Sequence, residues 1–393
     1  MNLDRIRVRN YRALADVDIG LNPVNVIFGP NGAGKSTLLD TIYFFRDCAI
    51  RGVELASSNR HHGIGLLWDG ADEGSGIEIE LTAGSVTYEL AFSLAPGKLD
   101  PYPGEKLISA NRDAALISRH TGSDKATLYN VQVDQAVPIE LREPEKTSLG
   151  LFLDFNRGDS EAGGLDHLLH FVRMYHSRSF RLVALKRHGS ESSHQTRLWD
   201  LGDNAWSVLR NIKDARELDS RYDTIMRYMS EAFPFFDGIV LEATGPNTVY
   251  ASLREKHRRK TVLASGASDG VLQLLLILIA LFSEGEREAV LLLDEPEIAL
   301  HPWAIAVLAQ AVQHAASEWR KQVLIATHSP VLISQFEPGD ILVARMEEGR
   351  AHFDRLSEIE GIGDLLEQYA TGALYMSQEI AGQGPGAVGD AQQ

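Results

Sequence analysis

The pattern of apolar and polar positions predicts β-strands in the N-terminal part of the chain. Apolar and polar residues alternate over Arg5–Arg9 and Ala13–Ile19, and the run Val24–Phe28 is largely apolar. The segments Ile77–Leu81 and Val86–Leu94 alternate as well, with a glycine turn between them. A period of two around a short turn is typical of an antiparallel hairpin with one solvated face. We therefore expect strands that lead up to residue 28, followed by an accessory antiparallel sheet.

Helical periodicity prevails from about residue 149 to residue 238. It is seen in "GGLDHLLHFVRMY" and "NAWSVLRNIKDARELDSRYDTIMRYMSEAF", and "FPFFDG" then breaks the pattern. Short strands return from Ile239, and they alternate with an apolar helix at Val271 and a second helix from Pro302. The later strands are "AVLLLDE", "QVLIAT" and "DILVARM". Parallel strands that alternate with helices predict an α/β sheet to which both ends of the chain contribute.

These patterns predict four segments. Residues 1–148 form the N-terminal part of a head domain with the accessory antiparallel sheet, and residues 149–238 form an inserted helical segment. Residues 239–380 complete the head, and residues 381–393, rich in Gly, Gln and Ala, form a disordered tail.

Composition narrows the class of protein. The chain has 393 residues, of which 44% are hydrophobic, so it can bury a substantial core. The single cysteine, Cys48, cannot form an internal disulfide, and the N-terminus is charged where a signal peptide would be apolar. The longest apolar run, Val271–Phe282, is shorter than the roughly 20 residues that a bilayer requires. We therefore expect a cytoplasmic protein with no membrane partner. The net charge of −16 disfavours a surface that is basic all over, although local basic patches could still contact nucleic acid.

The segment "GPNGAGKS" matches the phosphate-loop pattern G-x-x-x-x-G-K-[ST] between a predicted strand and a predicted helix. In such a loop the backbone N–H groups and the helix N-terminus surround phosphates. Lys35 is expected to contact the β and γ phosphates, Ser36 to bind Mg²⁺, and Thr37 to lie near the α phosphate. The candidate nucleotide-binding residues here are Gly29, Pro30, Asn31, Gly32, Ala33, Gly34, Lys35, Ser36 and Thr37. The cofactors predicted are ATP and Mg²⁺.

Two further motifs follow predicted strands of the sheet. In "EAVLLLDEPEIALHP" the apolar run Val290–Leu293 ends in Asp294 and Glu295. Ligands of open α/β sheets bind at the carboxyl ends of the strands, so Asp294 is expected to bind Mg²⁺ and Glu295 to accept a proton from the attacking water. His328, in "ATHSP", stands at the end of the next strand, where its imidazole could contact the γ phosphate.

A fourth motif lies at the start of the apolar helix. Ser268, Asp269 and Gly270 precede "VLQLLLILIAL", so the helix start would present N–H groups and a hydroxyl to an anion. An ordinary helix cap would have the same sequence. Because the chain already has one phosphate loop, a second anion-binding helix start makes most sense if it serves the nucleotide of another subunit.

The order of these motifs resembles that of the ABC-class ATPases, and within them the RecF/SMC-like predicted ATPases. It is similar to the ATPase module of the overcoming-lysogenization-defect (OLD) proteins. The resemblance rests on "IRVRNYRAL", "FGPNGAGKST", "SDGVLQLL", "LLLDEPEIALHP" and "THSP", which cover both ends of the chain. It implies an ABC-ATPase-like P-loop fold with a mixed sheet, in which two subunits enclose ATP. Ser268 and Gly270 would then act on the nucleotide that Lys35 of the other subunit holds.

The chain also departs from that pattern. No glutamine occurs between Thr37 and Gln132, so the glutamine that usually follows the first sheet has no obvious counterpart. Ala299-Leu300-His301 stands where many relatives have an aspartate. Related defence proteins carry a nuclease domain after the ATPase, whereas only about 50 residues follow Arg345. The expectation is therefore an ATPase without its own nuclease.

Several functions share these motifs. The leading interpretation is an ATP-hydrolysing homodimer in DNA repair or anti-phage defence, acting with DNA, a separate nuclease or another effector. The alternatives are a nucleotide-gated switch with negligible turnover and, ranked lower, a transporter's nucleotide-binding subunit or a hexameric motor. Basic residues at 173–187 and in "REKHRRK" (Arg254–Lys260) could contact a phosphate backbone or could simply be solvated.

Overall fold

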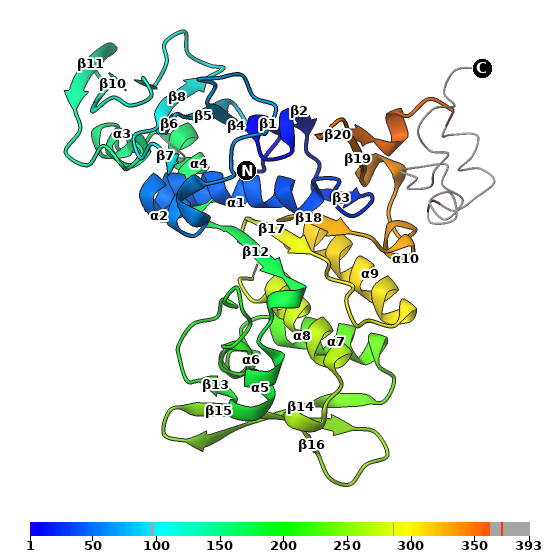
Figure 1. Ribbon diagram of the computed structural model, residues 1–393. Coiled ribbons are helices and arrows are strands. Elements are labelled where there is room, and N and C mark those ends of the chain that lie inside the picture. The colour runs from blue at the N-terminus through cyan, green and yellow to red at the C-terminus, as the bar shows by residue number, and fades with distance from the viewer. Residues whose placement is uncertain (96–97, 286, 362–370, 372–393) are drawn as a thin grey trace. The chain divides into compact units, whose positions relative to one another are not determined.

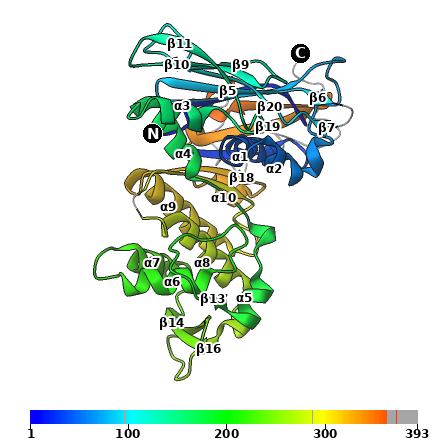
Figure 2. The ribbon, with the colours of Figure 1, turned by 90° about the vertical axis from the view of Figure 1, so that its left-hand side faces the viewer.

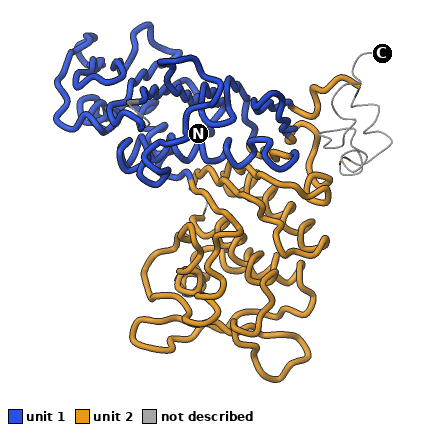
Figure 3. Tube along the Cα trace, in the orientation of Figure 1, with its two compact units in different colours: residues 1–22, 29–172, 342–354 blue, residues 23–28, 173–341, 355–393 orange. Residues whose placement is uncertain are grey.

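The computed structural model describes residues 1–95, 98–285, 287–361 and 371, and its elements are labelled in Figure 1. The tail predicted for 381–393 lies outside the described residues, as do residues 362–370 and 372–380 of the predicted head. The chain divides into two compact units (Figure 3). Unit 1 comprises residues 1–22, 29–172 and 342–354, and unit 2 comprises residues 23–28, 173–341 and 355–393.

Unit 1 contains an eight-stranded sheet with the order β11-β10-β9-β8-β5-β4-β1-β2. Its strands are β1 (Arg5–Tyr11), β2 (Leu14–Gly20), β4 (Ile77–Ala83), β5 (Val86–Phe92), β8 (Gly104–Ser109), β9 (Ile117–Arg119), β10 (Lys125–Asn130) and β11 (Gln135–Glu140). The predicted hairpin is confirmed, because β4 and β5 pair antiparallel around Gly84. Unit 1 also holds the short strands β6 (Leu94–Ala95) and β7 (Lys98–Leu99) and most of β19 (Ile341–Glu347) and β20 (Arg350–Arg355).

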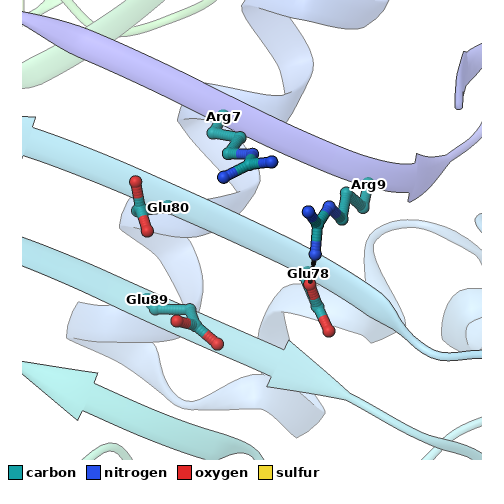
Figure 4. Close-up of a pocket in the computed structure, with 5 residues that line it drawn as sticks. All are labelled: Arg7, Arg9, Glu78, Glu80 and Glu89. Atoms are coloured by element: carbon teal, nitrogen blue, oxygen red, sulfur yellow. Dashed lines mark hydrogen bonds and ion pairs between the residues drawn. The ribbon is translucent and has the colours of Figure 1, made fainter. Parts of the chain in front are cut away.

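Alternation along the sheet leaves charged residues on its solvated face (Figure 4). Arg7 lies opposite Glu80 and Arg9 opposite Glu78, and the Arg9 guanidinium is 3.1 Å from the Glu78 carboxylate. Glu80 in turn faces Glu89. Partial burial, followed by the nearby charges of Glu78 and Glu80, raises the pKa of Glu89. The arginines of β1 thus offset a carboxylate cluster that would otherwise weaken the cross-strand pairing.

Helix α1 (Lys35–Arg51) packs on the other face of this sheet (Figure 2). The Phe44 ring lies 5.6 Å from the Tyr11 ring and 5.5 Å from the Phe92 ring, and Phe45 meets Tyr88 edge-on. Aromatic pairs at these distances add to the free energy of burial. The other helices of unit 1 are α2 (Val53–Ser58), α3 (Leu149–Phe155) and α4 (Ser160–His170).

Asp40, on the second turn of α1, fixes this helix to its surroundings. Its carboxylate accepts hydrogen bonds from the Tyr11 hydroxyl and from the guanidinium groups of Arg12 and Arg60. Burial opposes ionisation of Asp40, but the Arg60 hydrogen bonds and the charges of Arg60 and Arg12 outweigh it, so the pKa of Asp40 is lowered. The turn in "RNYRAL" therefore helps to set the position of the helix that begins at Lys35.

Unit 2 is built around the strands β12 (Val172–His176), β17 (Ala289–Asp294), β18 (Lys321–Thr327) and β3 (Val24–Phe28), in that order. β17 pairs parallel with β18, and β18 pairs parallel with β3. In this register Asp294 lies beside Ala326, and Ala326 lies beside Ile27. The carboxyl ends of the three strands therefore share one edge of the sheet. β17, β18 and β3 are buried almost throughout, as strands covered on both faces are.

Helices α7 (Arg221–Ala232), α8 (Asp269–Phe282) and α9 (Pro302–Glu318) pack against one another in unit 2 (Figures 1 and 2). α8 is buried from Val271 to Phe282, which explains its uniformly apolar sequence. The remaining elements are α5 (Leu182–His188), α6 (Ala205–Asp214), α10 (Pro330–Ile333) and the strands β13 (Ser190–Glu191), β14 (Phe236–Gly245), β15 (Thr248–Glu255) and β16 (Val262–Leu263). No helix among the described residues is long and apolar enough to cross a membrane.

One local prediction was wrong. The segment "GGLDHLLHFVRMY" has helical periodicity, yet α4 ends at His170 and Val172–His176 forms strand β12. The residues Val172, Met174 and Tyr175 are almost fully buried. Pairing with β17 in the sheet overrides the local pattern, because a short apolar run is compatible with both helix and strand.

Candidate functional site

The glycine-rich loop of unit 1 lies close to neighbouring backbone and side chains. A Cβ on Gly29 would approach the Ala344 carbonyl oxygen to 2.2 Å, so no larger residue fits there. Gly34, the residue before α1, has φ = 90°, and a Cβ there would lie 2.8 Å from the Ala351 Cβ. A side chain at Gly34 would therefore be strained by both the backbone and the packing. These two contacts explain why the loop has glycine at both positions.

Lys35 is bent back over the loop. Its Nζ donates hydrogen bonds to the carbonyl oxygens of Gly29 (2.9 Å) and Pro30 (2.7 Å), and the residue is only 4% exposed. The ammonium group is thus held at the mouth of the loop by neutral carbonyls. Gly34 makes no side-chain cap at the start of α1, and a helix N-terminus after a glycine-rich loop is the kind of position where anions bind.

The acidic pair lies at the carboxyl edge of unit 2. Asp294 ends β17, and Glu295 follows in a left-handed backbone conformation with φ = 51°. The Glu295 N–H donates to the Ala326 carbonyl at 2.8 Å, which extends the pairing to β18 by one residue. A left-handed glutamate is uncommon, and such strain is frequent in functional turns.

The structure brings Glu295 and His328 together, as the sequence motifs suggested. The His328 Nε2 is 3.3 Å from the Glu295 Oε1. The other oxygen, Oε2, accepts a hydrogen bond from the Arg178 Nε at 2.5 Å. Asp294 in turn has the His176 Nδ1 at 2.9 Å from its Oδ2. Asp294 therefore contacts the last residue of β12, and Glu295 contacts the turn that follows this strand.

His176 and Arg178 were not predicted as site residues. Arg178 was noted only as part of a basic cluster, and His176 was not singled out. Both lie more than 100 residues before Asp294 in the chain, and their proximity depends on β12 being the neighbour of β17. The signal that could have found them is the buried run "VRMY" followed directly by polar residues, since a sheet strand that ends this way places them at the carboxyl edge.

Glu297 is a third residue that the sequence motifs did not identify. Its carboxylate accepts hydrogen bonds from the Thr327 hydroxyl and from the His328 N–H (3.3 Å), while its Oε2 is buried without a partner among the described residues. Burial raises the pKa of Glu297, although the hydrogen bonds from Thr327 and His328 act to lower it. Glu297 thus fixes the backbone that carries the His328 imidazole.

The signature residues begin α8. The Ser268 Oγ accepts a hydrogen bond from the Val271 N–H at 3.4 Å, which is a helix cap. The Asp269 carboxylate is 2.5 Å from the Lys186 Nζ. Gly270 lies against the turn that follows the acidic pair, because a Cβ on Gly270 would be 2.4 Å from the Ala299 carbonyl oxygen. Ser268, Asp269 and Gly270 therefore each make local contacts within the chain.

The oxygen donors of these motifs suit a hard divalent cation. Ser36 offers a hydroxyl and Asp294 a carboxylate, and Mg²⁺ commonly takes one or two protein oxygens together with phosphates and waters. Within the part of the chain that the structure describes, no group of three or more His, Cys, Asp or Glu side chains is arranged to hold a metal alone. Ser36 in unit 1 and Asp294 in unit 2 each offer an oxygen donor of the kind that Mg²⁺ takes.

Comparison with known families shows which protein family the chain belongs to. Residues 24–334 match the family described as "AAA domain, putative AbiEii toxin, Type IV TA system". The chain belongs to this AAA-domain family. The match extends from strand β3 to helix α10, and so it includes the phosphate loop, the signature, the acidic pair and His328.

Individual curated relatives of this AAA-domain protein include an OLD nuclease and RecF proteins. It is 23% identical to the OLD nuclease of Thermus scotoductus over 348 residues, which are 85% of this chain and 61% of the relative. It is 43% identical to the DNA replication and repair protein RecF of Bacteroides thetaiotaomicron over 63 residues, 16% of this chain and 17% of RecF. The chain thus spans less than two thirds of these relatives.

A solved structure supports the fold. The SMC head bound to the C-terminal winged-helix domain of ScpA aligns with a TM-score of 0.51 and 13% identity, over 90% of this chain and 97% of the head. At this identity the likeness concerns the fold alone. The ABC-ATPase-like α/β fold that the motifs implied is confirmed.

Proposed function

We propose that this protein binds ATP with Mg²⁺ and hydrolyses it. The observation that carries the proposal is the acidic edge of unit 2, where Glu295 lies 3.3 Å from His328 and follows Asp294. Strand β3 ends at the same edge, since Phe28 pairs with Thr327, and the phosphate loop begins at the next residue, Gly29. Chain connectivity therefore supports the action of both motifs on one nucleotide.

Each residue has a distinct role in this proposal. The Lys35 ammonium exchanges the Gly29 and Pro30 carbonyls for phosphate oxygens. Glu295 accepts a proton from the attacking water, while His328 contacts the terminal phosphate. Mg²⁺, if held by Ser36 and Asp294, would neutralise part of the negative charge of the phosphates.

A nucleotide-gated switch with negligible turnover is the second candidate. The contact of Arg178 with Glu295 favours it, because a carboxylate that already accepts an arginine is less available to a water molecule. The Glu295→Gln experiment in the Discussion decides between the two functions.

We also propose that two chains enclose two nucleotides. Ser268 and Gly270 stand at the start of α8 in a chain that has its own phosphate loop, and Gly270 packs directly against the Ala299 carbonyl. A helix start in this position suits the terminal phosphate held by a second copy.

Mixing two inactive variants tests the dimer. Lys35→Ala removes the loop lysine and Ser268→Arg obstructs the helix start, so each homodimer should be inactive. Random pairing makes about half of the dimers mixed, each with one intact composite site, so a 1:1 mixture should recover about a quarter of the wild-type turnover. Light scattering should also show a dimer with a non-hydrolysable ATP analogue and a monomer with ADP. A monomer in both states, with no recovery of turnover, contradicts the sandwich.

The binding partners of the protein are also proposed rather than observed. Because relatives include an OLD nuclease and a DNA replication and repair protein, we propose a role in DNA maintenance or anti-phage defence, with DNA or a separate nuclease as partner. Of the predicted basic cluster at 173–187, Arg173, Arg178 and Lys186 pair with Glu284, Glu295 and Asp269. The exposed residues of the β15–β16 loop are therefore the better candidates for contact with a phosphate backbone.

Salt dependence of DNA binding tests that loop. Replacement of Lys256, Arg259 and Lys260 by Gln should weaken duplex binding and reduce the slope of log affinity against log salt by about 2 to 3, since each lost phosphate contact removes about 0.9. The matched control replaces three exposed lysines of unit 1, Lys98, Lys106 and Lys125, by Gln. Unchanged affinity and slope in the loop variant would exclude this loop as the DNA contact.

A further inference from the structure

The Glu295 carboxylate has donors at both of its oxygens. His328 lies at Oε1 and Arg178 at Oε2, and the Glu295 side chain is only 18% exposed. A general base needs an oxygen that can accept the proton of a water molecule. Each carboxylate oxygen can accept two hydrogen bonds, so a water molecule would compete with these donors for Glu295. Departure of one donor would leave one oxygen wholly to the water.

Arg178 is the donor that is free to leave. Its side chain is 75% exposed, against 31% for His328, and it lies on the single turn Ser177–Ser179. The His328 backbone, by contrast, is held by the Glu297 carboxylate. An exposed ion pair of this kind contributes little to folding, so its separation costs the protein little.

The backbone that carries Arg178 is nevertheless fixed. The buried Gln273 side chain of α8 donates to the Ser177 carbonyl at 3.2 Å, and the preceding His176 contacts Asp294. The turn is thus anchored on one side to the signature helix and on the other to the acidic pair. Only the long arginine side chain needs to move, and exposed side chains change rotamer in picoseconds to nanoseconds.

We propose that Arg178 transfers from Glu295 to the terminal phosphate of a bound nucleoside triphosphate, and that this transfer leaves the Glu295 Oε2 to the attacking water. The inference rests on the proposed function. The guanidinium group can donate two parallel hydrogen bonds to two phosphate oxygens. A phosphate with two negative charges therefore competes well with one carboxylate for the Arg178 side chain. His176 remains at Asp294 as a positioning residue. A diphosphate lacks the terminal group, so Arg178 stays at Glu295 when ADP is bound.

Nucleotide affinities of Arg178→Ala and Arg178→Lys test the proposal without reliance on turnover. We expect Arg178→Ala to bind a non-hydrolysable triphosphate about tenfold more weakly, as the loss of one charge-assisted contact predicts, while ADP affinity stays within about twofold. Arg178→Lys should recover part of the triphosphate affinity, and added guanidinium ion should restore it in Arg178→Ala. The matched control is Arg181→Ala, three residues along, which removes an exposed arginine paired with Asp203 rather than with Glu295.

The outcomes separate this inference from the proposed function. If Arg178→Ala binds triphosphate and diphosphate with the wild-type affinities, the proposed transfer is wrong. The same holds if this variant hydrolyses ATP faster than the wild type, because Arg178 would then only block Glu295. If the wild type binds ATP without turnover, hydrolysis fails as a function, yet the ratio of affinities still decides the role of Arg178. A wild type that binds no triphosphate overturns both. Thermal unfolding of each variant shows whether the fold is kept.

Discussion

Lys35→Ala is expected to lower ATP affinity by about 10²-fold or more, because it removes the main point charge that faces the β and γ phosphates. The remaining loop offers neutral N–H groups, which bind phosphate more weakly than an ammonium does. Titration of ATP into the purified variant, in the presence of Mg²⁺, measures the effect.

The same substitution also removes two hydrogen bonds within the loop, to the carbonyls of Gly29 and Pro30. Thermal unfolding should therefore accompany the titration. Lys146→Ala is a suitable control, because that lysine is exposed and its ammonium group pairs with the Glu143 carboxylate. Wild-type ATP affinity in Lys35→Ala would rule out this loop as the nucleotide site.

Glu295→Gln is expected to reduce hydrolysis by about 10²-fold or more while ATP binding persists, because the amide keeps the size of the side chain but cannot accept the water proton. Trapped ATP would then stabilise the dimer. Single-turnover hydrolysis, measured beside nucleotide affinity, separates the two effects.

Neighbouring variants sharpen this test. Asp294→Asn should weaken Mg²⁺-dependent binding itself, whereas His328→Ala should lower turnover with a smaller change in affinity. Glu288→Gln is the matched control, since Glu288 immediately precedes the opposite end of β17 and pairs with Arg320. If Glu295→Gln hydrolyses ATP at the wild-type rate, Glu295 is not the base and the switch becomes the better interpretation.

The parts of the site that follow from local sequence could be predicted. The apolar run Val290–Leu293 is short and ends at the acidic pair Asp294-Glu295, and a run of this kind predicts the buried strand that the structure shows. The phosphate loop is likewise a contiguous pattern, as is the hairpin of β4 and β5. In each case the physical cause acts over fewer than about 20 residues, within the range of strand, turn and helix preferences.

The contacts of Arg178 and His176 could not be predicted in this way. They depend on which strand becomes the neighbour of β17, and the sequence "HFVRMY" continues a helical pattern up to the point where it becomes β12. The sequence lacks a glutamine in the region where the family pattern has one, and that pattern does not point to His176, which contacts Asp294. Glu297 was overlooked for a related reason: its contact with the His328 backbone joins two strand ends that are remote in sequence.

The close approach of Gly270 to the Ala299 carbonyl has a consequence for cooperativity between subunits. The start of α8 and the turn from Glu295 to Ala299 touch without room for a single methyl group, so a shift of one displaces the other. In the proposed dimer, α8 would face the partner's nucleotide while the turn faces its own. Events at the two nucleotides would then share a coupling free energy, and linkage requires that coupling to be reciprocal for binding. Binding at the two sites is therefore expected to be coupled, with a Hill coefficient for ATP that differs from about 1. A Gly270→Ala chain, in which the turn must move to admit the methyl group, should alter this cooperativity even though its phosphate loop is unchanged.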